Sequence, residues 1–275
     1  MSTVIEVENT VPDQINRYST ANRVTGNTAA ITPGLASRTA VLIYSLTSYA
    51  LGMTGLIWLI LAMGGLVPYG FGPVHTVSPV TAILVDMGLI FLFGLQHTIM
   101  ARRTFKEKIT LLIPKAAERS TFVLASGMVM CLAVWCWQSV PGTVWSVEST
   151  AAKFVLWGFY LAGWTYLVVS TFVTNHFELF GLRQAYLYFR GIPYTPVKFI
   201  NKWMYSYSRH PMMLGVLVGL WSIPVMSASH FFLSLLLTAY IAVGVLFEER
   251  GLINEFGDTY REYKRSIGTF FTLSK

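Results

Sequence analysis

The sequence predicts an all-α membrane protein: a polytopic transmembrane bundle of five to six helices, with a C-terminal helical hairpin and amphipathic cytoplasmic helices. Of the 275 residues, 54% are hydrophobic and only 12% are charged, whereas soluble domains carry about 25% charged residues. Several apolar runs reach the length of about 20 residues that a helix needs to cross the hydrocarbon core. The basic residues gather in alternate loops between these runs, as the positive-inside rule predicts for cytoplasmic loops.

The chain divides into three expected parts. Residues 1–38 are polar and show no signal peptide, so we expect a mobile cytoplasmic tail. Residues 248–275 are expected to form a cytoplasmic amphipathic helix and tail. Residues 39–247 are expected to form the transmembrane bundle, with spans near 41–66, 80–100, 120–140 and 154–175 and a hairpin over 212–247.

The loop charges set the expected orientation. Residues 101–119 and 176–209 carry eleven Lys and Arg residues between them, whereas residues 67–79, 141–152 and 226–229 carry none. The two basic loops and both termini are therefore expected in the cytoplasm, in an inner or plasma membrane. Membrane orientation accounts for the net charge of +7, so no nucleic-acid partner is expected, and no obligate protein partner is evident.

Two polar segments have the spacing of amphipathic helices. In Glu178–Arg190 and in Arg250–Ile267, apolar residues recur at helical intervals and charged residues occupy the opposite side. Such helices lie on the membrane surface or cap a helical bundle. The two cysteines, Cys131 and Cys136, both fall within an apolar run and supply neither a disulfide framework nor a thiolate metal site.

The hairpin is expected to return the chain to the side of the membrane where it began. Val216 to Phe247 is a run of 32 residues without Lys, Arg, Asp or Glu, nearly enough for two crossings. Glu248 and Glu249 would then lie near Arg209. The two carboxylates stand about 100° apart on a helix, and they accept hydrogen bonds from ribose hydroxyls or an amino group. A charged helix end at the membrane surface is the alternative interpretation.

The start of the hairpin suits an anion. Proline is favoured at the first position of a helix, so Pro211 is expected to begin the first hairpin helix. The free backbone N–H groups beyond it, with Arg209 and His210 beside them, would bind a carboxylate or phosphate. Gly215 would allow another backbone or a ligand to approach closely. Arg209 and His210 alternatively form a membrane-interface flank.

A second polar group is expected at the same depth. Asn175, His176 and Glu178 follow the fourth span, and His97 lies near the end of the second. Histidine titrates nearest to neutrality, so these residues would orient and deprotonate a small nucleophile. The alternatives are polar capping, a helix-end histidine, or a haem between His97 and His176. Five scattered histidines do not suit a di-iron site, and no bound metal is expected.

Three other ionisable residues lie apart from these groups. Asp86 lies within the second span, farther from the cytoplasm, and its role stays open. His75 and His230 fall toward the opposite side of the membrane, and both are interpreted as structural.

The polar segments resemble a known group of membrane enzymes. The pattern that resembles the isoprenylcysteine carboxyl and phospholipid methyltransferase superfamily is Arg209-His210-Pro211 with Gly215, Glu248-Glu249-x-x-Leu252, and Phe256-Gly257-x-x-Tyr260-x-x-Tyr263. The segments that resemble methanethiol S-methyltransferases in particular are Gln96–Arg102, Glu118–Thr121 and Ser170–Gln184. The resemblance covers about residues 40 to 265. One departure is Met213, where the superfamily often has tyrosine.

The resemblance implies a reaction and a cofactor. The expected activity is methylation of methanethiol, a small thiol substrate, by S-adenosylmethionine, giving dimethyl sulfide in a membrane-embedded pocket that opens to the cytoplasm. Arg209 and His210 would hold the amino-acid end of the cofactor, and Glu248 or Glu249 its ribose or amino group. His176 or His97 would be the base, helped by Glu178. Methylation of a prenyl-cysteine or lipid headgroup, and a non-enzymatic haem-binding or transport protein, are the alternatives.

Overall fold

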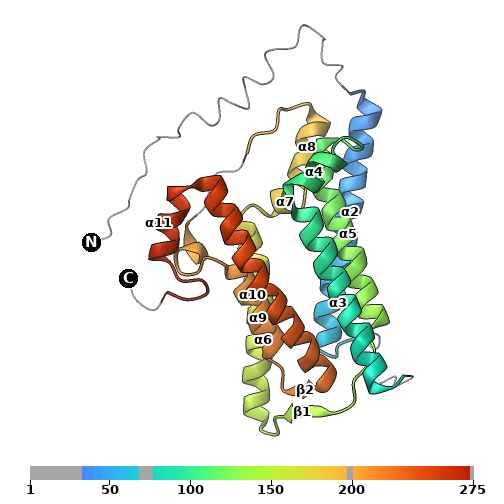
Figure 1. The fold of residues 1–275 in the computed structure, drawn as a ribbon, viewed down its shortest axis with the longest axis vertical. Coiled ribbons are helices and arrows are strands. Elements are labelled where there is room, and N and C mark those ends of the chain that lie inside the picture. Colours follow the sequence, from blue (N-terminus) through green and yellow to red (C-terminus); the bar gives the residue numbers. More distant parts are fainter. Residues whose placement is uncertain (1–32, 68–76, 197–200, 273–275) are drawn as a thin grey trace. The chain divides into compact units, whose positions relative to one another are not determined.

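The computed structural model describes residues 33–67, 77–196 and 201–272, and its regular structure is almost entirely helical (Figure 1). The elements are α2 (Leu35–Met63), α3 (Pro79–Ala101), α4 (Arg103–Ile109), α5 (Lys115–Cys136), β1 (Thr143–Ser146), α6 (Thr150–Val173), α7 (His176–Leu179), α8 (Leu182–Arg190), the 3-10 turn η1 (Trp203–Ser206), α9 (Pro211–Trp221), β2 (Val225–Ser227), α10 (Ala228–Phe256) and α11 (Asp258–Ser266). The all-α prediction is confirmed.

Five of the described helices are long and apolar enough to cross a membrane. They are α2, α3, α5, α6 and α10, and α9 is a shorter apolar helix of 11 residues. This agrees with the expected count of five to six. The hairpin is asymmetric, however, because α10 spans 29 residues and continues past residue 247 to Phe256.

The end of the chain differs from the prediction of one amphipathic helix over Arg250–Ile267. Glu248 and Glu249 lie inside α10 rather than after it. Gly257 adopts a left-handed backbone with φ 59°, which interrupts the helix before α11 begins at Asp258. Glycine tolerates this conformation at little steric cost, so α11 turns away from the axis of α10 (Figure 1).

The N-terminal boundary also differs. The expected tail over residues 1–38 lies mostly outside the described residues, but α2 already begins at Leu35. Arg38 secures this first part of the helix by donating to the backbone oxygen of Tyr188 at 3.0 Å and to that of Phe189. The segment Glu178–Arg190, which was expected to lie on the membrane surface or to cap the bundle, contains α8. This helix packs on α2 and α5 around the buried Ala185 and so caps the bundle.

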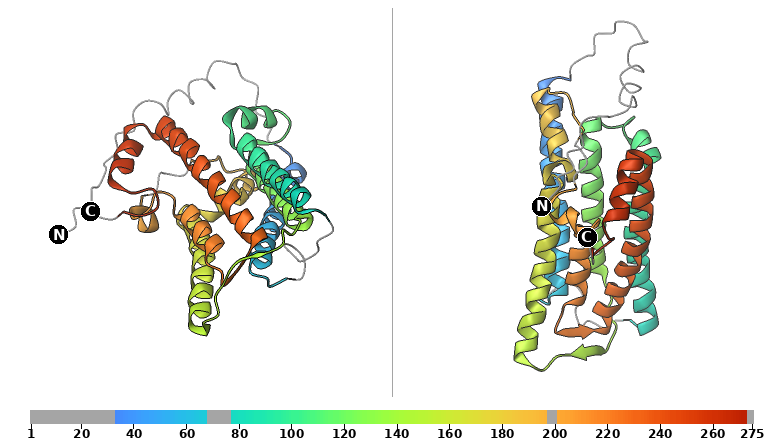
Figure 2. Two further views of the ribbon diagram at one scale, coloured as in Figure 1. Left: turned by 60° about the horizontal axis from the view of Figure 1, so that its bottom comes forward. Right: turned by 90° about the vertical axis from the view of Figure 1, so that its left-hand side faces the viewer.

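Glycines allow the closest helix contacts. In the pair α2 and α5, a Cβ on Gly127 would lie 2.6 Å from the Cα of Gly52. In the pair α6 and α9, a Cβ on Gly215 would lie 2.7 Å from the backbone oxygen of Gly163. Small residues at such interfaces let helix backbones approach, which favours van der Waals packing in a membrane. These two pairs are the most extensive helix contacts of the bundle, and α10 lies beside α3 (Figure 2).

We expect Gly215→Val to destabilise the folded protein by about 1–3 kcal/mol, the usual cost of overpacking. The added side chain would collide with the backbone of α6 at Gly163 and Leu167, which has no flexible end that can move aside. Thermal survival of the detergent-solubilised protein, followed by size exclusion, measures the effect. Gly244→Val on α10 is the control, because a Cβ there meets nothing within 4 Å. Equal losses in both variants would contradict the packing argument.

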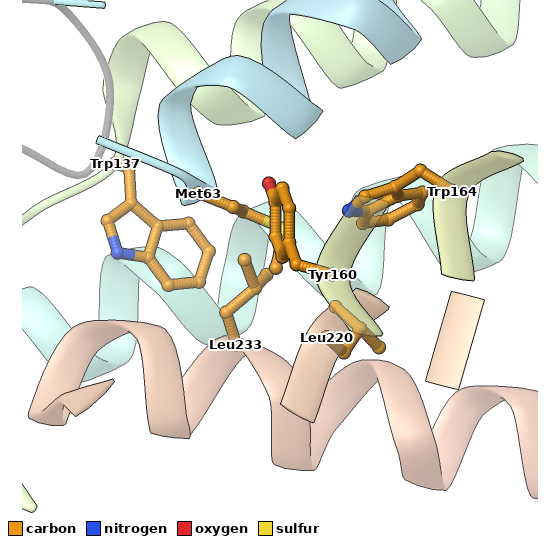
Figure 3. Close-up of a cluster of buried hydrophobic side chains, with 6 residues drawn as sticks. All are labelled: Met63, Trp137, Tyr160, Trp164, Leu220 and Leu233. Carbon is orange, nitrogen blue, oxygen red and sulfur yellow. The ribbon is translucent and has the colours of Figure 1, made fainter. Parts of the chain in front are cut away.

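The apolar core lies toward the end of the bundle that carries β1 and β2. It contains Met63, Trp137, Tyr160, Trp164, Leu220 and Leu233 (Figure 3). The Tyr160 hydroxyl donates to the backbone oxygen of Ile60, and His230 bonds the backbone oxygen of Leu220 at 2.9 Å, in agreement with its structural interpretation. His75 lies outside the described residues. This end is therefore held by packing and by hydrogen bonds to helix backbones.

Asp86 links two helices near this core. The residue is fully buried on α3, and its Oδ1 accepts a hydrogen bond from the backbone N–H of Gln138 at 2.9 Å, just beyond the end of α5. The antiparallel pairing of β1 with β2 was not predicted. The two strands have four and three residues and are far apart in the chain, so their pairing depends on tertiary structure.

Candidate active site

The predicted site segments lie toward one end of the bundle. Figure 1 shows α4, α7, α8 and α11 toward this end, here called the polar end, and the β1–β2 pair at the other. The helices α4, α7 and α8 come from the two basic stretches 101–119 and 176–209, and α11 belongs to the C-terminal segment. The charge alternation of the sequence thus corresponds to a real separation of polar and apolar ends.

Arg209 and Glu249 form a buried ion pair at the polar end. Arg209 Nε donates to Glu249 Oε1 at 2.7 Å, and the two side chains are only 7% and 6% exposed. Lys264 Nζ contacts the other carboxylate oxygen at 2.6 Å. Arg209 also donates to the backbone oxygens of Lys264 and Ile267 and to Thr269 Oγ1. Arg209 therefore joins α9, α10, α11 and the following tail.

His210 separates the two adjacent glutamates. Its Nε2 lies 3.2 Å from Glu249 Oε1, and its Nδ1 lies 3.6 Å from Glu248 Oε2. Glu248 is 46% exposed, so its carboxylate faces solvent, whereas that of Glu249 is enclosed. Pro211 is the first residue of α9, as predicted. Gly215 lies against α6, so the close approach it permits is to a backbone.

Two tyrosines beside this cluster are buried and uncharged. Burial raises the pKa of Tyr205 and of Tyr260 to about 12. The nearby Tyr263 hydroxyl donates to the backbone oxygen of Tyr205 at 2.6 Å. These side chains therefore add packing to the C-terminal segment and no charge near neutrality.

His176 is buried, and both of its ring nitrogens are engaged. Nδ1 lies 2.8 Å from Thr171 Oγ1, and Nε2 lies 2.8 Å from the Tyr49 hydroxyl. Thr171 donates its own proton to the backbone oxygen of Val168, so Nδ1 carries the imidazole proton and Nε2 accepts from Tyr49. The ring also stacks on Phe172 at 4.2 Å. His176 thus links α2 to α6.

Burial lowers the pKa of His176 below its ordinary value of 6.5. As the pH falls below 6.5, this histidine binds a proton in the unfolded chain before it does so in the folded protein. Protonation therefore favours unfolding, so the free energy of unfolding is highest above pH 6.5 and decreases below it. We expect the melting temperature to decrease from about pH 7 to 5, and His176→Gln to flatten this decrease. Melting curves of both proteins across this range measure it. An unchanged slope in the variant would contradict the assignment.

The turn between α6 and α8 is held by Asn175 and Glu178. Asn175 has a left-handed backbone with φ 85°, which asparagine tolerates better than most residues, and its side chain caps α7. The Glu178 carboxylate accepts bonds from Arg183 at 2.8 Å, Gln184 at 2.9 Å and Tyr194 at 2.6 Å. Glu178 is thus an organising centre of the turn, and its described contacts do not include His176.

His97 lies on α3, where it packs against α5 and α10. Its ring stacks on Phe93 and packs against Phe122 and Tyr240. Nδ1 has one long contact, 3.4 Å to Ser126 Oγ. Among the described residues, Nε2 has no hydrogen-bond partner. His97 therefore has one ring nitrogen that the described part of the protein does not engage.

Arg119 connects the surroundings of His97 to the α7 turn. Its guanidinium lies over the Phe122 ring at 4.8 Å from the centroid, and Nε donates to the backbone oxygen of Leu179 at 2.6 Å. Sequence reasoning assigned no role to Arg119. The sequence did contain a pointer to this residue, because Arg119 lies within Glu118–Thr121, one of the segments that carry the family resemblance.

An open cavity of about 340 Å³ lies beside Arg119. Its lining comes from α4, α5, the α7 turn, α8 and the segment after α8, and consists of Lys106, Glu118, Arg119, Thr174, Glu178, Leu179, Gln184 and Tyr194. Burial, followed by the bond to Glu178, raises the pKa of Tyr194 to about 12. The cavity therefore presents two cations, two carboxylates and neutral polar groups, a set that suits a small polar or zwitterionic ligand.

The fold and this site together define an integral membrane protein with a polar cavity at one end of its helical bundle. Proteins named methanethiol S-methyltransferase resemble it over most of its length. That of Mycobacterium tuberculosis is 42% identical over 186 residues (68% of this chain, 76% of the relative). Those of Crocosphaera subtropica (38% identical; 84% of this chain, 91% of the relative) and Bradyrhizobium diazoefficiens (39% identical; 84% and 89%) match over 232 residues each.

The chain belongs to the methanethiol S-methyltransferase family, and it is a methyltransferase that acts on a thiol. No family model matches the sequence, and no solved structure matches it. The family resemblance inferred from the polar motifs is confirmed.

Proposed function

We propose that the protein transfers the methyl group of S-adenosylmethionine to methanethiol and releases dimethyl sulfide. The observation that carries this proposal is the identity of 38–42% to relatives that bear this substrate in their name, over more than two thirds of the chain. The reacting end faces the cytoplasm in this proposal, because eleven basic residues occur in the two loops of that end.

The ionisable groups of the polar end fit the methyl donor. S-adenosylmethionine carries a carboxylate, an ammonium, a ribose diol and a sulfonium, and when bound it supplies an electrophilic methyl group. Glu248 is the exposed carboxylate beside α9, and it would accept hydrogen bonds from the ribose or the ammonium. The backbone N–H groups of the first turn of α9, which have no partner within the helix itself, would receive the donor's carboxylate.

Arg209 and Glu249 position the residues that bind the donor and do not bind the donor themselves. Their charged atoms are already used within the protein, on each other and on Lys264. They would hold α9, α10 and α11 at fixed spacing, so that Glu248 and the first turn of α9 face the same ligand. Accurate positioning of this kind accounts for a large part of catalysis in displacement reactions.

His97 is the better candidate for the base that takes the proton of the thiol. Both nitrogens of His176 are engaged by Thr171 and Tyr49, whereas Nε2 of His97 has no partner among the described residues. The same contacts leave His176 no nitrogen for a haem iron. Asn175 and Glu178 would preserve the α7 turn that borders the cavity.

Headspace gas chromatography tests the proposal. Membranes that contain the protein are incubated with S-adenosylmethionine and methanethiol, and dimethyl sulfide is measured against membranes without the protein. We expect dimethyl sulfide only when the protein and both substrates are present. Absence of dimethyl sulfide together with absence of S-adenosylmethionine binding in calorimetry would overturn the proposal. A prenyl-cysteine analogue methylated in preference to methanethiol would instead assign the site to methylation of a carboxylate, which gives a methyl ester.

A further inference from the structure

Arg119 lines the cavity without a carboxylate in ion-pair contact, although the carboxylates of Glu118 and Glu178 favour its charge from a longer distance. Its Nε is used by the backbone oxygen of Leu179, and one face of the guanidinium is covered by Phe122. Its terminal nitrogens have no hydrogen-bond partner, and no carboxylate lies within 4.0 Å of them, within residues 33–67, 77–196 and 201–272. A guanidinium does not lose its proton near neutrality, so this site favours an anion.

The carboxylates of the cavity are engaged elsewhere. Glu118 lies 4.0 Å from Lys106, and Glu178 is bonded by Arg183, Gln184 and Tyr194. Arg119 therefore differs from Arg209, whose charge is matched by Glu249. Ionisable groups near membrane depth that lack a partner are costly, and they commonly mark a binding site. The missing partner of Arg119 is then supplied by a ligand.

The position of Arg119 indicates which anion this is. Arg119 and His97 contact the same ring, that of Phe122, at centroid distances of 4.8 and 4.7 Å. Arg119 and the proposed base are thus neighbours across one aromatic ring. In thiol methylation the anion formed beside the base is the nucleophile, because the thiolate, not the thiol, attacks.

We propose that Arg119 binds the sulfur of the substrate as its thiolate and is a catalytic residue of the reaction. This inference rests on the proposed function. The S–H proton passes to the base and is later released to water. The thiolate electron pair forms the new S–CH₃ bond as the donor's S–CH₃ bond breaks, so thiolate and sulfonium become two neutral thioethers. Dimethyl sulfide carries no charge, so Arg119 no longer holds it and the product leaves.

Thiols of different acidity test this role. Arg119→Gln is assayed with methanethiol and with 2,2,2-trifluoroethanethiol, a more acidic thiol of which a far larger fraction is ionised at neutral pH. We expect kcat/KM for methanethiol at neutral pH to fall about 10²-fold, as for loss of one charge-stabilising donor. For the acidic thiol we expect a loss of about tenfold or less. Arg119→Lys, which retains the charge, should restore part of the activity with methanethiol, and KM for S-adenosylmethionine should stay unchanged.

Arg183→Gln is the matched control. Arg183 also supports the α7 turn, through Glu178, but it does not line the cavity, so any loss should be equal for the two thiols. An equal loss for both thiols in Arg119→Gln, with a raised KM for S-adenosylmethionine, would assign Arg119 to the donor's carboxylate and overturn the inference. An equal loss with reduced thermal stability would overturn it in favour of a structural role. Wild-type protein that makes no dimethyl sulfide would instead overturn the proposed function.

Discussion

Glu249→Ala is expected to destabilise the protein by about 3–5 kcal/mol, the usual cost of breaking a buried ion pair by removing one partner. The Glu249 carboxylate contacts Arg209 at 2.7 Å, Lys264 at 2.6 Å and His210 at 3.2 Å. Its removal leaves the guanidinium of Arg209 buried without a counter-ion. Because Arg209 also holds the backbone after α11, the C-terminal segment should detach from the start of α9. Thermal unfolding in detergent and the yield of monodisperse protein measure this loss.

Glu248→Ala is the control on the adjacent residue. Glu248 is 46% exposed, and its described ion-pair contact is to His210 at 3.6 Å, so we expect stability to change by less than about 1 kcal/mol. The affinity for S-adenosylmethionine, measured by calorimetry, should instead fall about tenfold, the effect of one charged hydrogen bond. Similar destabilisation by both substitutions would contradict the division of roles. Unchanged donor affinity in a folded Glu248→Ala protein would refute the cofactor assignment.

His97→Gln is expected to lower kcat for methanethiol by about 10²- to 10⁴-fold, the usual contribution of a general base. Nε2 of His97 has no hydrogen-bond partner among the described residues, and glutamine cannot replace an imidazole as a base. The rate of the variant should rise with pH, since hydroxide and solvent ionise more thiol as the pH increases. Initial rates of dimethyl sulfide release between about pH 6 and 9 measure both effects.

The corresponding changes at His176 distinguish a base from a structural histidine. Tyr49→Phe removes the bond to Nε2 of His176 but leaves the ring in place. We expect this variant to lose stability while retaining kcat within about tenfold, because the hydrogen bond that it removes contributes about 1 kcal/mol. A larger fall of kcat in Tyr49→Phe than in His97→Gln would show instead that the proton passes through Tyr49 to His176.

The fold class and the placement of the polar segments could be predicted because their signals are local. An apolar run of sufficient length forms a membrane-spanning helix wherever it occurs, since its backbone must satisfy its own hydrogen bonds in lipid. The span expected at 80–100 is therefore close to α3 at Pro79–Ala101. Helix ends were less accurate: α2 begins earlier and α10 ends later than expected, because packing on α8 and α11 supports helix beyond the apolar run.

The sequence by itself thus determined a helical membrane bundle, its basic end and the segments that meet there. Only the tertiary structure decided which of the adjacent carboxylates is buried: Glu249 faces Arg209 and Lys264, whereas Glu248 faces solvent. It likewise decided that His176 is engaged on both nitrogens and that Arg119 lines a cavity without a carboxylate in ion-pair contact among the described residues. Burial and partner choice are set by residues far apart in the chain, and no local pattern encodes them.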